Sequence, residues 1–232
     1  MAGASGAIGA VLCRLLVADG WHVSGTTRSA QRAERLRALG VAPVIVDVFD
    51  REALIRTVAA ARPEVVVHQL TDLPKEATAE GMAAARPRNA RIREVGTDNL
   101  VAAAVSAGAK RIVAQSIAFA YAPGQRPYSE ESPLDAASYP SVLELERLVL
   151  GCGLPGVVLR YGRLYGPNTW TPAPPPEGPV HVQAAADAAR RTMDRGEPGV
   201  YNIAEEDGFV TTAKARRQLG WRPEFRLGGP SA

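Results

Sequence analysis

Hydrophobic and polar positions follow two alternating periods along the first 160 residues of the chain. Short apolar runs rich in β-branched residues, such as Glu64–Gln69 and Arg111–Gln115, predict buried strands. Stretches with apolar residues three and four positions apart, such as Arg91–Ala107 and Ser141–Leu150, predict helices. This alternation is typical of a parallel sheet covered by helices on both faces. The sequence therefore predicts an α/β fold with a doubly wound parallel sheet, whose ligands bind where the strands end.

Capping residues and glycines mark the ends of the other expected elements. Ser29 and Asp50 each precede a helical pattern, and Gly20 and Gly40 each follow one. Further along, residues 171–179 (TPAPPPEGP) form a proline-rich connector without helical or strand periodicity. The remaining expected elements are helices over Ala10–Ala18, Val182–Met193 and Thr212–Leu219, and strands over Trp21–Thr26, Pro43–Asp47, Gly156–Arg160 and Val200–Ile203.

Composition excludes several classes of protein. Hydrophobic residues make up 46% of the 232 residues, enough for a buried core, and the formal net charge is only +3. The basic residues are spread along the chain, so nucleic acid is not the expected partner. Cys13 and Cys152 lack disulfide or metal-ligand spacing. No apolar run is long enough to span a membrane and no signal-peptide pattern is present, so a cytoplasmic protein without a metal site is expected.

Three glycines near the start form the strongest candidate binding feature. Gly3, Gly6 and Gly9 have the spacing G-x-x-G-x-x-G and lead directly into a helical pattern. Glycine permits positive φ and close approach of a phosphate, and the amino end of a helix offers free N–H groups to a diphosphate. Ser5 adds a hydroxyl donor to the same loop. The pattern predicts a Rossmann-type dinucleotide site, although chance spacing of small residues gives the same letters.

The stretch before this loop is unusually short. A Rossmann loop follows a hydrophobic first strand, yet only Met1 and Ala2 precede Gly3. The central strand is therefore expected either to be missing from this sequence or to begin upstream of it. Losing it outright is costly, because both neighbouring strands would expose unpaired backbone groups.

The ends of the second and third strands bear on the choice of cofactor. The second strand runs into Thr27-Arg28-Ser29 without the acidic residue that binds ribose hydroxyls in NAD sites. Arg28 can pair with a 2′-phosphate, which favours NADP over NAD, but it can equally be a solvated residue before a helix. Asp47-Val48 closes the third strand, where the carboxylate suits the adenine amino group; a plain strand-end aspartate is the alternative.

Seven motifs in order resemble those of the extended short-chain dehydrogenase/reductases, the NAD-dependent epimerase/dehydratase superfamily. They cover nearly the whole chain: Gly3–Gly9, Asp47-Val48, Val66–His68, Gly96–Leu100, Leu159–Pro167, Pro198–Ile203 and Ala213–Pro223. The resemblance implies a dinucleotide-binding domain over residues 1–168 and a shortened substrate region over 169–232 that packs on it. It also implies a homodimer and a small-molecule substrate.

The resemblance also implies cofactor contacts at particular positions. The diphosphate would meet Gly3, Gly6, Ile8 and Gly9. The residues after the fourth strand that would line the cofactor are Gln69, Leu70 and Thr71, and those near the nicotinamide would be Tyr161 and Leu164.

The catalytic residues of that family are only partly present. A serine after the fifth strand matches Ser116, although a capping or core hydroxyl is as good an interpretation. The proton-transferring tyrosine matches Tyr139, but Leu143 stands where the lysine four residues later is expected. Aligning the helix by its glutamates instead puts Ser138 and Val142 at these two positions. The chain is therefore expected to be an atypical member, because a tyrosine without that lysine is a poor base but still an acid.

Three functions follow from these observations. The first is an oxidoreductase that acts with NADP, or with NAD, on a small carbonyl or alcohol. The second is a non-redox cyclase, lyase or isomerase on the same scaffold, suggested by the missing lysine and the short substrate region. The third is a redox-silent sensor that binds NADP(H).

Overall fold

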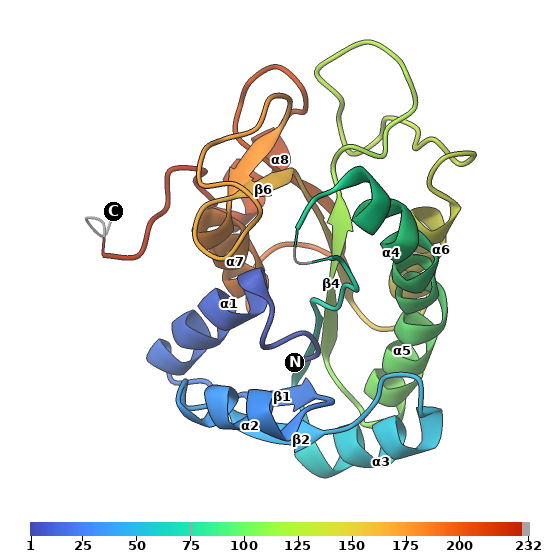
Figure 1. The fold of residues 1–232 in the computed structure, drawn as a ribbon, viewed down its shortest axis with the longest axis vertical. Coiled ribbons are helices and arrows are strands. Elements are labelled where there is room, and N and C mark those ends of the chain that lie inside the picture. Colours follow the sequence, from blue (N-terminus) through green and yellow to red (C-terminus); the bar gives the residue numbers. More distant parts are fainter. Residues whose placement is uncertain (75, 229–232) are drawn as a thin grey trace.

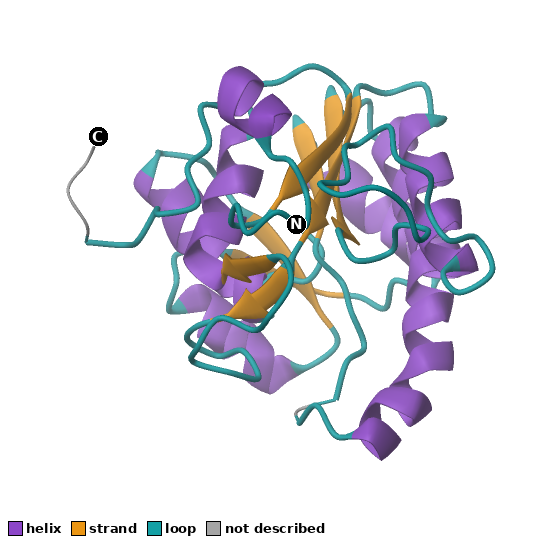
Figure 2. Cartoon of the chain, turned by 90° about the horizontal axis from the view of Figure 1, so that it is seen from above, coloured by secondary structure: helices purple, strands orange, loops and turns teal. Residues whose placement is uncertain are grey.

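A parallel sheet between two layers of helices forms the body of the protein (Figures 1 and 2). The computed structural model describes residues 1–74 and 76–228. The main strands are β1 (Ser24–Thr27), β2 (Ala42–Ile45), β3 (Val65–His68), β4 (Arg111–Ile117), β5 (Gly156–Tyr161) and β8 (Gly199–Ile203). All of their pairings are parallel, with β1 beside β2 and the order β3-β4-β5-β8 in the larger part. The predicted doubly wound α/β architecture is therefore confirmed.

The dipeptide Met1-Ala2 joins the two parts of this sheet. The Ala2 N–H donates to the Val67 carbonyl, and the Ala2 carbonyl accepts from the Gln69 N–H, at 2.8 and 2.9 Å. On the other side the Thr26 N–H donates to the Met1 carbonyl at 2.9 Å. Two residues thus take the central position between β1 and β3, directly before the glycine loop, and Figure 1 shows the N-terminus in the middle of the fold.

Each face of the sheet carries its own hydrophobic core. On one face lie α1 (Ala7–Ala18), α7 (Val182–Arg191) and α8 (Ala213–Leu219), whose buried side chains meet Val113 and Leu159 of the sheet. On the other lie α3 (Arg51–Ala61), α5 (Thr97–Ser106) and α6 (Pro140–Leu150), which pack on Ile112 and Val158. Alternate residues of one strand therefore face opposite layers, which decides where each candidate side chain points.

Local capping explains where several helices begin. The Ser29 side chain accepts from the Arg32 N–H at the start of α2 (Ala30–Arg37), and Asp50 accepts from the Ala53 N–H before α3. Both caps were predicted from the sequence, and the observed ends of most elements differ from the expected ones by one to three residues.

Several elements differ from the sequence-based expectation. Helix α4 (Ala79–Arg91) contains Pro87 and was not predicted, because a proline within a pattern ordinarily ends a helix. It continues through η1 (Ile92–Gly96), one π-helical turn, into α5. Two short strands, β6 (Arg163–Tyr165) and β7 (Pro179–His181), were also missed and pair parallel to each other. The division at residue 168 stays an interpretation, since β8 belongs to the main sheet.

Candidate dinucleotide site and its neighbours

The glycine loop closes tightly against β3. Gly3 has φ +83°, and a Cβ built on it would lie 2.3 Å from the Gln69 carbonyl oxygen. A Cβ on Gly9 would lie 2.1 Å from the Gly3 carbonyl oxygen, so neither position accepts a side chain. Gly6 differs, because its Cβ would meet only the Gly3 oxygen at 3.4 Å. Gly3 and Gly9 thus shape the turn, and Gly6 keeps its outer surface open.

The amino end of α1 is left uncapped by side chains. Gly6 is the capping residue, no side chain accepts from the first-turn N–H groups, and no acidic residue occupies that turn. Ser5 and Gly6 are exposed, while Ile8 and Gly9 are buried against the sheet. Free N–H groups and the positive end of the helix dipole make this a suitable place for a diphosphate. The residues present therefore fit the group that the sequence predicts here.

Arg28 and Asp47 share one surface hollow beyond β1 and β2. Both side chains are exposed. The hollow has a volume of about 400 Å³, and the residues lining it are Arg28, Ile45, Val46, Asp47, Asp50, Ala53 and Thr57. The Asp47 carboxylate accepts from the Phe49 N–H at 3.0 Å, and the Val48 carbonyl accepts from the Asn99 amide at 2.9 Å. The structure thus places Arg28, expected to favour NADP over NAD, in the same hollow as Asp47, expected to bind the adenine amino group.

The end of β3 places a buried polar side chain beside Tyr161. The Gln69 amide nitrogen donates to the Tyr161 hydroxyl at 3.4 Å, and its buried amide oxygen has no partner among the described residues. Burial raises the pKa of Tyr161, so its hydroxyl stays protonated. Leu70 is held through its carbonyl by the Gln115 amide at 3.1 Å, Thr71 is exposed, and Leu164 is half-buried in β6. The unpartnered amide oxygen of Gln69 fits a position that receives a hydrogen bond from a bound ligand.

Ser116 lies within a buried polar cluster under α6. Its hydroxyl donates to Glu146 at 2.7 Å, and Arg160 donates to both oxygens of the same carboxylate at 2.9 and 2.7 Å. Burial by itself lowers the pKa of Arg160, but the bonds to Glu146 and Tyr121 outweigh it and raise that pKa. Ser116 faces the α6 layer, so using its hydroxyl on a substrate would require breaking this bond. Its catalytic role stays a prediction.

Tyr139 precedes α6 and is half-buried. Its carbonyl accepts from the Val142 and Leu143 N–H groups, and Pro140 begins the helix. At the two positions where a lysine is expected, Val142 is buried and Leu143 is half-buried. Among the described lysines, Lys110 pairs with Glu64 and Lys214 donates to the Val200 carbonyl, so neither serves Tyr139. Lys75 lies outside the described residues. The catalytic role of Tyr139 also stays a prediction.

Sequence reasoning missed one charged residue in this region. Arg93 belongs to η1 and is half-buried, and after burial its charge is the second cause that lowers the pKa of His68. The available signal was its position one helical turn before the motif Gly96–Leu100.

His68 is the fully buried residue that fixes η1 to the sheet. Its Nδ1 accepts from the Leu70 N–H at 3.2 Å, so Nε2 carries the proton and donates to the Thr97 hydroxyl at 2.9 Å. The Thr97 hydroxyl donates in turn to the Ile92 carbonyl at 3.4 Å. Burial, and then the charge of Arg93, lowers the pKa of His68 to about 4 from 6.5.

The stability of the protein is therefore expected to fall as the pH drops from about 6.5 to about 4. The unfolded chain binds a proton at His68 in this range and the folded chain does not, so acid favours unfolding, by up to about 3 kcal/mol. Urea unfolding of the native protein and of His68→Gln across this range measures the difference. Between these pH values, the unfolding free energy of the native protein should fall more steeply with decreasing pH than that of the variant, by the slope that one bound proton gives. Equal slopes for the two proteins would contradict the assignment.

The described residues also bear on metal binding and on membrane insertion. No group of three or more histidine, cysteine, aspartate or glutamate side chains there could hold a metal ion. Within the same residues, no helix has the length and apolarity needed to cross a membrane.

Comparison with known proteins identifies a matching family and two relatives of similar sequence. Residues 1–186 match the family described as the NAD dependent epimerase/dehydratase family. A 3-diazoavenalumate denitrifying reductase from Streptomyces sp is 41% identical over 241 residues, covering 89% of this chain and 75% of the relative. A 4-hydroxy-2-methyl-3-oxo-4-farnesyl-3,4-dihydroquinoline-1-oxide ketoreductase from Stigmatella aurantiaca is 32% identical over 177 residues, covering 71% of this chain and 49% of that protein.

Solved structures share the fold. UDP-glucose 4-epimerase from Bifidobacterium longum, solved with NAD⁺ and UDP, superposes with a TM-score of 0.77. The two sequences are 19% identical, and the match covers 97% of this chain and 93% of the epimerase.

Proposed function

The chain belongs to the NAD dependent epimerase/dehydratase family, and from this premise we propose that it is a nicotinamide-dependent oxidoreductase acting on a small carbonyl or alcohol. The observation that carries the proposal is the uncapped amino end of α1 beneath Gly3, Gly6 and Gly9. Two relatives named as reductases support an oxidoreductase rather than another member of the family.

The proposed cofactor residues form a path along the carboxyl edge of the sheet. The loop Gly3–Gly9, with Ile8 and the Ser5 hydroxyl, would bind the diphosphate through N–H groups. Asp47 and Val48 would lie at the adenine end. The other proposed neighbours are Gln69, Leu70 and Thr71 after β3, and Tyr161 and Leu164 beside the nicotinamide. When bound, the dinucleotide supplies or accepts a hydride.

NADP is the proposed form of the cofactor. Arg28 is exposed at the end of β1, and the carboxylates among the described residues that line the same hollow are Asp47 and Asp50. A guanidinium there can bind a 2′-phosphate with two parallel hydrogen bonds. The NAD-bound structural relatives leave the choice between NAD and NADP open for this chain.

Tyr139 is the proposed proton donor to the substrate oxygen. It lies at the start of α6, at the same edge of the molecule as the end of β3. Without a lysine it would hold and release a proton as an acid. Ser116 would help to place α6 through Glu146, and a direct contact with the substrate stays a prediction for it.

A second candidate function is a non-redox reaction on the same scaffold. The specific observation in its favour is that Val142 and Leu143 occupy both positions open to the lysine. A redox-silent sensor of NADP(H) would leave the same positions apolar. A homodimer, implied by the resemblance, stays a prediction; the exposed apolar side chains that it could cover are Val95, Val105 and Leu150.

Nicotinamide absorbance during reaction with a panel of small ketones and aldehydes tests the proposal. We expect consumption of reduced cofactor matched by alcohol product, faster with NADPH than with NADH. In Arg28→Ala the two cofactors should become nearly equal, because the residue proposed to contact the 2′-phosphate is gone. Product without cofactor consumption would establish the second function, and tight binding without any turnover would establish the sensor.

A further inference from the structure

Arg93 occupies a position between the end of β3 and the start of α6. It belongs to the π-helical turn η1, which packs against α6, and Thr97 directly after this turn is hydrogen-bonded to His68 at the end of β3. The hydrogen bonds from His68 to Thr97 and from Thr97 to Ile92 hold this turn in place. Such single turns within α-helices are often found at functional sites. The fold thus fixes the backbone that carries this guanidinium.

Within the part of the chain that the structure describes, the guanidinium of Arg93 has no anionic partner. Among residues 1–74 and 76–228, no hydrogen bond or ion pair of its side chain is found, although the residue is half-buried. Burial lowers the pKa of Arg93, as expected for a guanidinium without a bound carboxylate. Arg160, the other arginine deep in this region, is bound by both oxygens of Glu146.

An unpaired, partly desolvated cation is costly for a fold to keep. The His68 ring cannot accept a hydrogen bond from this guanidinium, because Nδ1 already accepts from the Leu70 N–H and Nε2 donates to the Thr97 hydroxyl. The cost is recovered when an anionic oxygen group arrives, since a guanidinium binds a carboxylate or a phosphate through charge-assisted hydrogen bonds.

We propose that Arg93 binds an anionic oxygen group of a ligand at the carboxyl edge of the sheet, either a substrate carboxylate or a phosphate of the dinucleotide. This inference rests on the site of the proposed function, and it narrows that function to substrates with an acidic group if the carboxylate is the partner. It concerns binding, so it does not depend on whether a hydride is transferred.

Calorimetry on the intact chain tests the proposal with two probes, NADPH alone and trans-cinnamate in the presence of saturating NADPH. Arg93→Met should weaken one of them at least tenfold, and Arg93→Lys should recover part of the loss because it restores charge without the planar fork. Arg91→Met is the matched control: it is exposed and lies over the Phe49 ring at 4.1 Å, so its loss should change neither affinity.

The pattern of losses identifies the ligand. Weaker cinnamate binding alone assigns the substrate carboxylate, and trans-cinnamamide should then bind both proteins equally weakly. Weaker NADPH binding assigns the phosphate. The melting temperature of ligand-free Arg93→Met should be unchanged or higher, because an unpaired charge is removed. A lower melting temperature with both affinities unchanged, or no binding of either probe to the native protein, overturns the proposal.

Discussion

Gly6→Val is expected to lower the affinity for a nicotinamide dinucleotide at least ~100-fold while leaving the protein folded. A Cβ at this position meets only the Gly3 oxygen at 3.4 Å, so the loop itself accepts the side chain. The added methyl groups would instead occupy the space in front of the first-turn N–H groups of α1, where a diphosphate must approach. Calorimetry with NADPH and NADH measures the loss.

The control is another glycine without positive φ. A Cβ on Gly124 would find its nearest neighbours at 3.6 and 3.8 Å, in the loop after β4 and away from the amino end of α1. Gly124→Val should therefore retain dinucleotide affinity. The unfolding free energy of Gly6→Val should change by at most about 1 kcal/mol, as for other helix caps. Unchanged affinity in a folded Gly6→Val protein would refute the diphosphate site.

Glu146→Ala is expected to cost about 3–5 kcal/mol of unfolding free energy, because it leaves the Arg160 charge buried and unpaired. The side chains of Arg160 and Glu146 are only 6% and 8% exposed, and the Ser116 hydroxyl would lose its acceptor as well. Urea unfolding monitored by tryptophan fluorescence measures the change. A loss below about 1 kcal/mol would show that water reaches this cluster.

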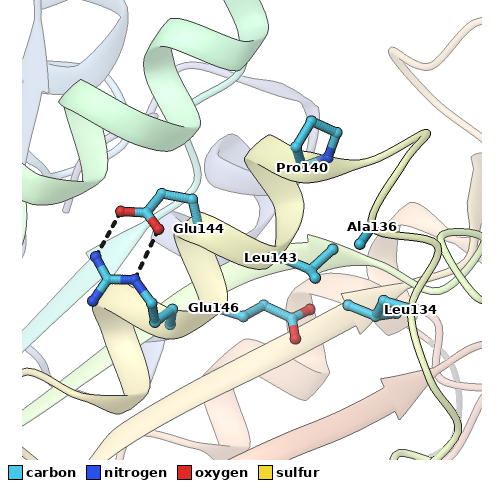
Figure 3. A pocket seen from close by; sticks show the side chains of 7 residues that line it. Leu134, Ala136, Pro140, Leu143, Glu144 and Glu146 are labelled. Atoms are coloured by element: carbon cyan, nitrogen blue, oxygen red, sulfur yellow. Dashed lines mark hydrogen bonds and ion pairs between the residues drawn. The ribbon is translucent and has the colours of Figure 1, made fainter.

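The same helix supplies the matched control. Glu144 pairs with Arg147 at 2.7 Å on the outer side of α6, where their side chains are 37% and 68% exposed. Figure 3 shows Glu144 and Glu146, which both line a hollow of about 470 Å³, leaving the helix in different directions. Glu144→Ala should lower the unfolding free energy by no more than about 0.5 kcal/mol, because water screens the attraction between two exposed charges.

The sheet and its helices could be predicted because their signals are local. Ser29 and Asp50 cap helices through side chains next to the segments that they begin. The strand residues Val65–Val67 are apolar because both faces of the sheet are covered. Each of these local structures depends on residues that are neighbours along the chain, so the sequence pattern predicts it directly.

The polar contacts could not be predicted, because they join residues far apart in the chain. Ser116 matches a catalytic position by letter, but the face of β4 on which it lies directs it to Glu146, 30 residues later. Arg93 is not part of a local sequence motif. Its lack of a partner among the described residues depends on where the nearby carboxylates lie in three dimensions. The helix around Pro87 was missed because its tertiary packing outweighs the local penalty of a proline.

Two segments that each follow proposed cofactor residues are joined by a hydrogen bond between residues far apart in the chain. The Trp170 indole N–H donates to the Pro74 carbonyl at 3.0 Å, across a separation of 96 residues. The connector after β6 therefore borders the loop that follows Thr71. The free-energy effects of substitutions in the two segments should be non-additive, because residues in contact change each other's surroundings. We therefore expect substitutions in the connector to change substrate preference more than dinucleotide affinity, because the proposed diphosphate contacts of Gly3–Gly9 do not involve the connector.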